Sequence, residues 1–161
     1  MQRADLSAAL SGLAAAVTLV TVADGRDDIG TTVTAFCPVS MDPPLVLVSI
    51  MAESYLAEVL GRCDGFAVTI LGSDQRALAG RFAAAGRPSA RLLLEGVPHR
   101  RAGDSGALIP EGGLAALDCR AWQRLEAGDH LLVIAEVTGV PYVTDAARPL
   151  IRFRGRYPAL A

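Results

Sequence analysis

Residues 30–50, GTTVTAFCPVSMDPPLVLVSI, decide the fold that we expect for this chain. Residues 31–36 alternate small hydroxyl side chains with apolar or aromatic ones, which is typical of a strand with one polar face. Residues 41–44 predict a sharp turn, because proline lacks a backbone N–H and disfavours α geometry in the residue before it. Residues 45–50 are apolar except for Ser49, which favours a strand buried on both faces.

The N-terminal side of this stretch predicts a helix and a hairpin. Leu6, Leu10 and Leu13 share one helical face, so we expect a short helix that is capped by Asp5 and lies over one end of the core. Residues 17–22 then read as a strand, and a turn-rich connection joins this strand to residues 31–36 as a hairpin.

The C-terminal side predicts more strands than helices. The expected elements are a helix over 54–61 capped by Ser54, a strand over 66–71, a helix from 73 through Phe82, a hairpin of 115–125 with 131–140, and a last strand over 150–156. Residues 86–113 have little periodicity, and we expect them to form a lid. Six or more strands with tight turns favour a mainly β, closed antiparallel barrel, because closure removes exposed strand edges.

Length and composition limit the domain count and the kinds of partner. The 161 residues, of which 52% are hydrophobic, fit a single domain over residues 1–161 with one core. The formal charge is −2, and all 15 basic residues are scattered arginines. Aromatic side chains make up only 5%, too few to alternate with arginines as stacking platforms, so we expect no nucleic-acid partner.

The cysteines and the apolar N-terminal stretch bear on location. Cys37, Cys63 and Cys119 are far apart and odd in number, which argues against disulfides or a zinc site and favours the cytoplasm. Residues 6–23 lack charge and could be read as a signal segment or a short membrane span. Their second half alternates like a strand, however, so we expect no membrane segment and no bound metal.

The side chains offer little chemistry of their own. The sequence has no G-x-S-x-G, no histidine cluster and no acidic pair spaced for sugar hydrolysis. A planar cofactor, by contrast, needs flat apolar walls, donors along one edge and contacts for any phosphate. Thr32 and Thr34 on one strand face, Ser40 and Ser49 around the turn, and two expected helix N-termini provide such groups.

From Val17 onward the chain resembles the short-chain flavin reductases of two-component monooxygenase systems. The shared stretches, in order, are DG, GTTVTAF, VSMDPPLVLVSI, FAVTIL, DQRALAGRF, LDCR, GDH, EV and FRGRY. The resemblance implies a homodimeric, six-stranded split barrel with Greek-key connections and a few short helices. It also implies FMN or FAD, NADH or NADPH, and a separate flavin-dependent monooxygenase that receives the reduced flavin.

The resemblance further implies roles for individual residues. His130, in GDH, would be the catalytic residue beside the nicotinamide and the flavin. The implied flavin-binding residues around the ring, on the ribityl-phosphate side and in the closing pocket are Thr32, Val33, Thr34, Ala35, Phe36, Val39, Ser40, Met41, Asp42, Ser49, Ser54, Phe66, Ala67, Thr69, Phe82, Arg154 and Tyr157. Leu56 and Thr69 depart from the family, which usually has Thr and Asn there, so they indicate either a loosely held flavin or a reassigned pocket.

Without the resemblance, several of these residues have simpler interpretations. His130 and Asp42 suit turns, Arg152 and Arg154 are outward charges on a last strand, and Phe82 belongs to a core stripe. Other expectations from the residues alone are burial of Cys37 and Cys119 as small hydrophobes and packing of Trp122 in a core or an interface.

These observations lead to one expected function and two alternatives. The expected function is NAD(P)H-dependent reduction of free flavin by hydride transfer, which requires stacked rings more than an acid or a base. One alternative is a split-barrel protein that binds a flavin or another planar metabolite without reducing it and has been repurposed in a biosynthetic pathway. The other is a structural dimer or an accessory to an oxygenase.

Overall fold

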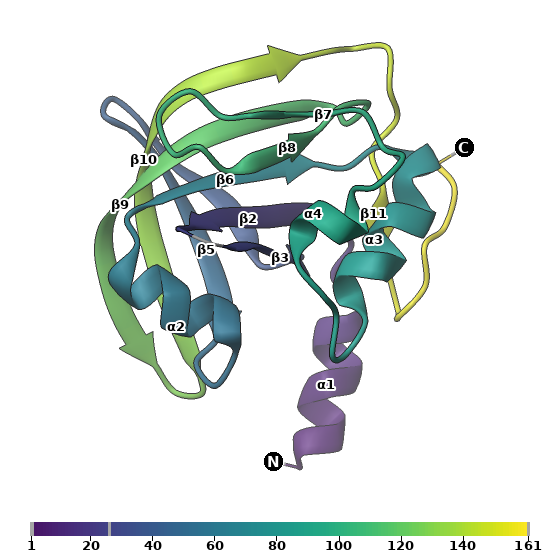
Figure 1. Ribbon diagram of the computed structural model, residues 1–161. Helices are drawn as coiled ribbons and strands as arrows, with labels where there is room; N and C mark the ends of the chain where they lie inside the picture. Colours follow the sequence, from purple (N-terminus) through teal and green to yellow (C-terminus); the bar gives the residue numbers. More distant parts are fainter. Residues whose placement is uncertain (1, 26, 161) are drawn as a thin grey trace.

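A computed structural model describes residues 2–25 and 27–160, and its main feature is an antiparallel sheet (Figure 1). In these residues the sheet has seven strands in the order β3-β2-β6-β9-β10-β5-β4. Their bounds are β2 Thr18–Asp24, β3 Asp27–Val33, β4 Phe36–Met41, β5 Pro44–Met51, β6 Gly65–Ile70, β9 Ala115–Ala127 and β10 His130–Val143. The mainly β prediction is confirmed, whereas the expected six strands are corrected to seven.

The two edge strands of this sheet are consecutive in the chain. Only Thr34 and Ala35 separate β3 from β4, so the expected strand over 31–36 is in fact interrupted there. Three Cα–Cα steps span about 11 Å, whereas the edges of a flat seven-stranded sheet lie roughly 29 Å apart. The sheet therefore has to curl, as Figure 1 shows. The Ser49 N–H donates to Ala35 O at 2.9 Å, which extends the β4–β5 pairing by one residue into the β3–β4 connection.

Both predicted hairpins are present with defined registers. β2 pairs with β3 from Thr18↔Val33 to Asp24↔Asp27, and β9 pairs with β10 from Ala127↔His130 onward. The predicted turn after Met41 is also correct, because β4 and β5 pair at Met41↔Pro44. Local periodicity and turn residues were therefore sufficient for these elements.

Helix α2, Tyr55–Arg62, covers one end of the curled sheet. As predicted, Ser54 is its N-cap, and the Ser54 Oγ accepts a hydrogen bond from Ala57 N at 3.1 Å. The apolar face of α2 is buried in a cluster with strand residues such as Val48 and Phe66. A second cluster contains Phe82 of α3, Arg76–Ala83, which follows a 3-10 turn at Ser73–Gln75.

Residues 86–113, expected to form a lid, pack against the sheet. They contain α4 Ala90–Leu93 and a small sheet of β7 His99–Arg101 with β8 Leu108–Pro110. Leu94 and Ile109 are fully buried. The buried Asp28 carboxylate of β3 accepts hydrogen bonds from Arg91 and Arg101, which holds this segment to the sheet.

The two ends of the chain differ most from expectation. Helix α1, Arg3–Ser11, has Gln2 rather than Asp5 as its N-cap, and none of its residues is buried. It projects from the rest of the chain instead of covering the core (Figure 1). The expected last strand over 150–156 is reduced to β11, Ile151–Arg152, which pairs with β1, Ala15–Ala16.

Three smaller expectations meet different outcomes. Cys119 is buried, which raises the pKa of its thiol to about 12, but Cys37 is exposed. Trp122 is 63% exposed and therefore lies outside the core. Among the described residues, no helix has the length and apolar content needed to cross a membrane, and no group of three or more His, Cys, Asp or Glu side chains is placed to hold a metal.

We predict that Asp28→Asn destabilises the protein and alters its acid sensitivity. Burial by itself raises the pKa of Asp28, but the hydrogen bonds and charges of Arg101 and Arg91 outweigh it and hold this pKa below its usual value. The wild-type contribution is therefore present above about pH 4 and is lost as the pH falls through the lowered pKa. In urea unfolding, Asp28→Asn should lower the free energy of unfolding by about 2 kcal/mol at neutral pH. On acidification this variant should lose less further stability than wild type does, because it has no carboxylate at position 28 to protonate.

The matched control for this prediction is Asp104→Asn, which removes an exposed ion pair with Arg120. An exposed pair contributes little, so this variant should change the free energy of unfolding by less than about 1 kcal/mol. Equal losses of unfolding free energy in the two variants would contradict the role of Asp28 in holding residues 86–113 on the sheet.

Candidate functional site

A hollow of about 360 Å³, here named the edge hollow, lies where β3 gives way to β4. Its lining includes residues of β3 and of the β3–β4 connection together with residues of β5 and β10. The sequence-predicted residues among them are Thr32, Val33, Thr34, Ala35, Ser49, Ser54 and His130. The structure thus brings residues of the edge strand β3 together with residues of β5 and β10, which lie near the opposite edge of the sheet, and the curl makes this possible.

The histidine of the edge hollow is fixed by a tight turn. His130 begins β10 opposite Met51, directly after the two-residue turn Gly128–Asp129. Gly128 has a φ of 62°, which this turn requires at its first position. The His130 Nδ1 lies 2.7 Å from Asp129 Oδ1, and this contact lowers the pKa of Asp129. Asp129 in turn favours a proton on Nδ1 and leaves Nε2 for other contacts.

A second hollow of about 350 Å³, the helix hollow, adjoins the first at Ser54 and Arg87. It lies at the N-terminus of α2, where N–H groups without helical partners favour an anion. The Ser54 hydroxyl already accepts the capping bond, so it retains its hydrogen as a donor. The two hollows together provide a surface that leads from His130 to a helix N-terminus.

Arg87 is the residue that sequence reasoning missed. Its Nε donates to Gly30 O at 2.8 Å and its Nη1 to Ala84 O at 3.2 Å. Within residues 2–25 and 27–160, no carboxylate forms an ion pair with it. Partial burial lowers its pKa from the usual value, yet an arginine stays charged at neutral pH. Arg87 is therefore a fixed cation facing both hollows, and its Gly-Arg-Pro context was the one available signal.

The edge hollow fits a planar ligand with polar groups on one side. β3 is an edge strand, so half of its backbone N–H and C=O groups point away from β2. Thr32, Thr34 and Ser49 add hydroxyl groups around the same hollow. Ile50 and Val33 supply apolar surface. This combination of edge donors and apolar walls is the one that a flat heteroaromatic ring requires.

Four other predicted residues lie along β4 and its turn, outside these two hollows. Val39, Met41 and Asp42 are exposed, and Ser40 is half-buried. Phe36, at the start of β4, packs against the core instead of lining either hollow. The structure therefore places the DPP turn at the far end of β4 from Thr34.

Further predicted residues are in the interior of the protein. Phe66, Ala67 and Phe82 are fully buried in the hydrophobic clusters. For Phe82 this agrees with its simpler interpretation as a core residue. Leu56, one of the two family departures, is buried but also touches the helix hollow. Thr69 is fully buried, and its Oγ1 has no hydrogen-bond partner among the described residues.

The last two predicted residues belong to the C-terminal segment. Arg154 adopts a φ of 48° in the tight turn after β11 and lines a separate cleft beside α1. Tyr157 packs against the second core cluster, with the guanidinium of Arg76 5.4 Å from its ring centre. Neither residue lines the edge hollow.

Comparison with known proteins adds a family to this geometry. The model of the flavin reductase like domain matches residues 10–161. The NADH-dependent FMN reductase AsuE2 of Streptomyces nodosus subsp. asukaensis is 34% identical over 158 residues, covering 98% of this chain and 85% of that protein. The reductase component of 4-hydroxyphenylacetate 3-monooxygenase from Thermus thermophilus is 33% identical over 152 residues, covering 94% and 93%.

A solved structure agrees with these sequence relatives. The NADH:FAD oxidoreductase SgcE6 of Streptomyces globisporus, in complex with NAD and FAD fragments, superposes with a TM-score of 0.91. It is 28% identical to this chain, and the match covers 99% of this chain and 93% of that one.

The unpartnered hydroxyl of Thr69 generates a prediction. Thr69→Val removes a buried polar atom that makes no hydrogen bond, so it should raise the free energy of unfolding by about 1 kcal/mol in urea titrations. The matched control is Thr18→Val on the adjacent strand β2. The Thr18 Oγ1 donates to Val33 O at 2.6 Å, and its loss should lower stability by about 1 kcal/mol. Destabilisation by both variants would mean that Thr69 has a partner.

Proposed function

The chain belongs to the flavin reductase like domain family, and from this premise we propose that it catalyses the NADH-dependent reduction of FMN or FAD. The observation that supports the proposal is the meeting of Thr32–Ala35, Ser49 and His130 in the edge hollow, next to the helix hollow, whose charged lining residues are Arg87 and Asp27. This arrangement offers a place for the ring, a place for the phosphate and a histidine beside the ring.

Different residues would bind the ring and the phosphate of a flavin. The edge groups of β3 and the hydroxyls of Thr32, Thr34 and Ser49 would bind the polar edge of the isoalloxazine ring. Arg87 and the N-terminus of α2 at Ser54 would hold the phosphate, since both favour negative charge. Because Arg87 lines both hollows, one flavin nucleotide can contact the residues of the edge hollow with its ring and those of the helix hollow with its phosphate.

His130 would position the nicotinamide beside the flavin ring. When bound, NADH supplies a hydride from nicotinamide C4 to flavin N5, so the protein has to hold two rings in contact. Asp129 fixes the His130 imidazole through the 2.7 Å contact at Nδ1. The Nε2 side would then be the one available to the nicotinamide amide group.

The assembly that we propose is a homodimeric split barrel with Greek-key connections. The two-residue link between β3 and β4 supports closure of the sheet, with the split at the edge hollow. The outer face of β5, β10 and β9 carries apolar side chains whose register puts Leu47 beside Ile134 and Leu132 beside Leu125. With the exposed Trp122 this face suits a second copy of the chain.

The proposed product is reduced flavin for a separate oxygenase in the cytoplasm. The Thermus relative is named as the reductase component of a monooxygenase, which supports such a partner. We propose that the flavin reaches the oxygenase by diffusion or by a transient contact, and that residues 1–161 act as one domain. The edge hollow is open at the surface, which suits a flavin that arrives and leaves.

The activity is tested by following the loss of nicotinamide absorbance with purified protein, with NADH or NADPH and with FMN, FAD or riboflavin. We expect oxidation that depends on added flavin and that is faster with NADH. A folded protein that oxidises neither nicotinamide with any flavin would overturn the proposal and favour a binding role.

His130→Ala should slow turnover while leaving flavin affinity nearly unchanged, because His130 faces the nicotinamide rather than the phosphate. Stopped-flow reduction of bound FMN measures the first quantity, and fluorescence titration with FMN measures the second. Unchanged turnover would remove His130 from the site.

Arg87→Gln should weaken FMN binding about tenfold, because one charged hydrogen bond to the phosphate is lost. Riboflavin, which lacks the phosphate, should bind wild type and variant equally. Arg87→Lys keeps the charge and should recover part of the affinity. If FMN and riboflavin lose affinity to the same extent, Arg87 acts on the shape of the site and not on the phosphate.

A further inference from the structure

Residues 86–91, here named the strap, lead from α3 into α4 and form one wall of the helix hollow. The strap lines the hollow with Gly86, Arg87, Pro88 and Ser89, and the start of α2 lines it with Ser54 and the two residues that follow. These two walls are far apart in the sequence. The helix hollow therefore keeps its shape only while the strap is held in place.

Side chains of the strap take the place of a neighbouring strand at the free edge of β3. The Arg87 Nε donates to Gly30 O at 2.8 Å, and the Ser89 Oγ donates to Asp28 O at 3.1 Å. The two donor residues and the two acceptor residues are each two positions apart and run in opposite directions, as in an antiparallel pairing. This register sets where Arg87 lies along β3.

The side chain of Asp28 fastens the strap from the interior of the protein. It is only 2% exposed, and it accepts hydrogen bonds from Arg91, at the end of the strap, and from the two Nη atoms of Arg101 at 2.9 and 3.0 Å. A carboxylate this deeply buried needs charged partners, so both arginines are kept against it. Asp28 thus holds the strap twice, through its carboxylate and through its carbonyl oxygen.

The anchor of the strap is separate from the surface that a ligand can reach. Asp28, Arg91 and Arg101 line neither the helix hollow nor the edge hollow, whereas Arg87 lines both. Any influence of Asp28 on a ligand in these hollows therefore has to pass through the position of the strap or through its charge.

We propose that Asp28 is a positioning residue for the flavin phosphate, acting through the strap that holds Arg87 at the helix hollow. The inference rests on the proposed function, because it takes Arg87 and the N-terminus of α2 as the phosphate site. An effect of charge alone has the opposite sign: removing a carboxylate and releasing two arginines near an anion site should tighten FMN binding. Loosening the strap should weaken it, so the sign of the change separates positioning from charge.

The test measures the affinity of the whole protein for FMN and for riboflavin by fluorescence titration. Asp28→Asn should weaken FMN binding about fivefold and leave riboflavin, which has no phosphate, unchanged. Arg101→Gln removes the same anchor from β7 and should act in the same direction. In an Arg87→Gln background, Asp28→Asn should cause no further loss of FMN affinity, because the residue that it positions is gone.

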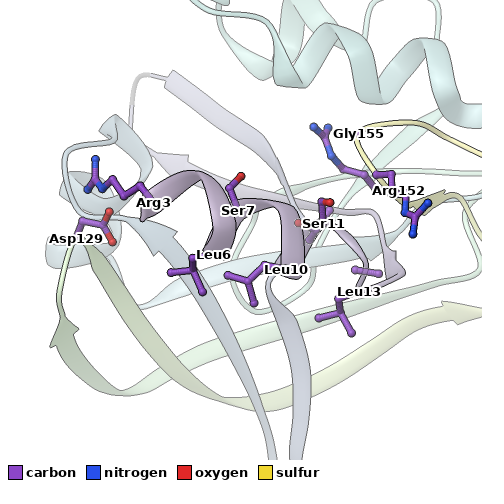
Figure 2. Close-up of a pocket in the computed structure, with 12 residues that line it drawn as sticks. Arg3, Leu6, Ser7, Leu10, Ser11, Leu13, Asp129, Arg152 and Gly155 are labelled. Carbon is purple, nitrogen blue, oxygen red and sulfur yellow. The ribbon is translucent and has the colours of Figure 1, made fainter. Parts of the chain in front are cut away.

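Two matched controls remove the same charges elsewhere. Asp104→Asn removes a carboxylate that is paired with an arginine at the surface. Arg152→Gln removes an arginine that lines the cleft beside α1, drawn in Figure 2, and that lines neither hollow. Both variants should leave the affinity for FMN unchanged.

Hydrogen exchange without any ligand follows the strap itself. Exchange over residues 84–93 should be faster in Asp28→Asn than in wild type and unchanged in the two controls. Strands β5 and β6 should keep their protection in Asp28→Asn, which shows that the variant is folded.

The inference is wrong if Asp28→Asn leaves FMN affinity unchanged or raises it, or if FMN and riboflavin lose affinity equally. Additive losses in the double variant, or unchanged exchange of the strap, would also overturn it. If wild type binds neither flavin, the proposed function is wrong and the inference falls with it. If wild type prefers FMN to riboflavin and Asp28→Asn keeps that full preference, only the inference is wrong.

Discussion

The structure depends on a constraint of connectivity. Thr34 and Ala35 are the only residues between β3 and β4, yet these strands occupy opposite edges of the seven-stranded sheet. A two-residue link cannot span a flat sheet of this width, so the sheet curls until its edges approach. Among the described residues β3 and β4 do not pair with each other, so no ladder closes the curled sheet. The incomplete closure leaves the edge hollow, where the side chains that we propose for flavin binding gather.

The arginines of the chain have two different roles. Arg91 and Arg101 bind the buried carboxylate of Asp28 and so hold the 86–113 segment on the sheet. Once that segment is held, Arg87 lies at the junction of the edge hollow and the helix hollow with no carboxylate partner among the described residues. The paired arginines thus fix the position of the unpaired one. Because the protein has no lysine, the positive charges that hold the fold and the one that lines the two hollows all come from arginine.

What the sequence could predict follows from the range of each interaction. The hairpins, the Pro-bounded turn and the Ser54 cap depend on neighbouring residues, and each was predicted correctly. The break at Thr34 was missed, because it reflects closure of the sheet and not the local alternation of residues 31–36. Burial of Cys37 was wrong because β4 is an edge strand, and strand order is not a local property. No periodic sequence pattern pointed to Arg87 as a site residue. Its position depends on the ion pairs of Asp28 with Arg91 and Arg101, which hold the segment that contains it.

The candidate site was also predicted only in part. The resemblance brought Thr32–Ala35, Ser49 and His130 into one group, and the structure finds them in one hollow. The same resemblance grouped Val39–Asp42 with them, but these residues lie along an edge strand that leads away from Thr34. Residues that are close in a motif can therefore lie at different ends of a strand.

The most direct test of the account is a crystal structure of the protein with FMN bound. The account predicts the isoalloxazine ring in the edge hollow beside Thr32–Ala35 and Ser49, with the phosphate between Arg87 and the N-terminus of α2. A flavin found in the cleft beside α1, or one whose phosphate contacts neither Arg87 nor Ser54, would contradict it.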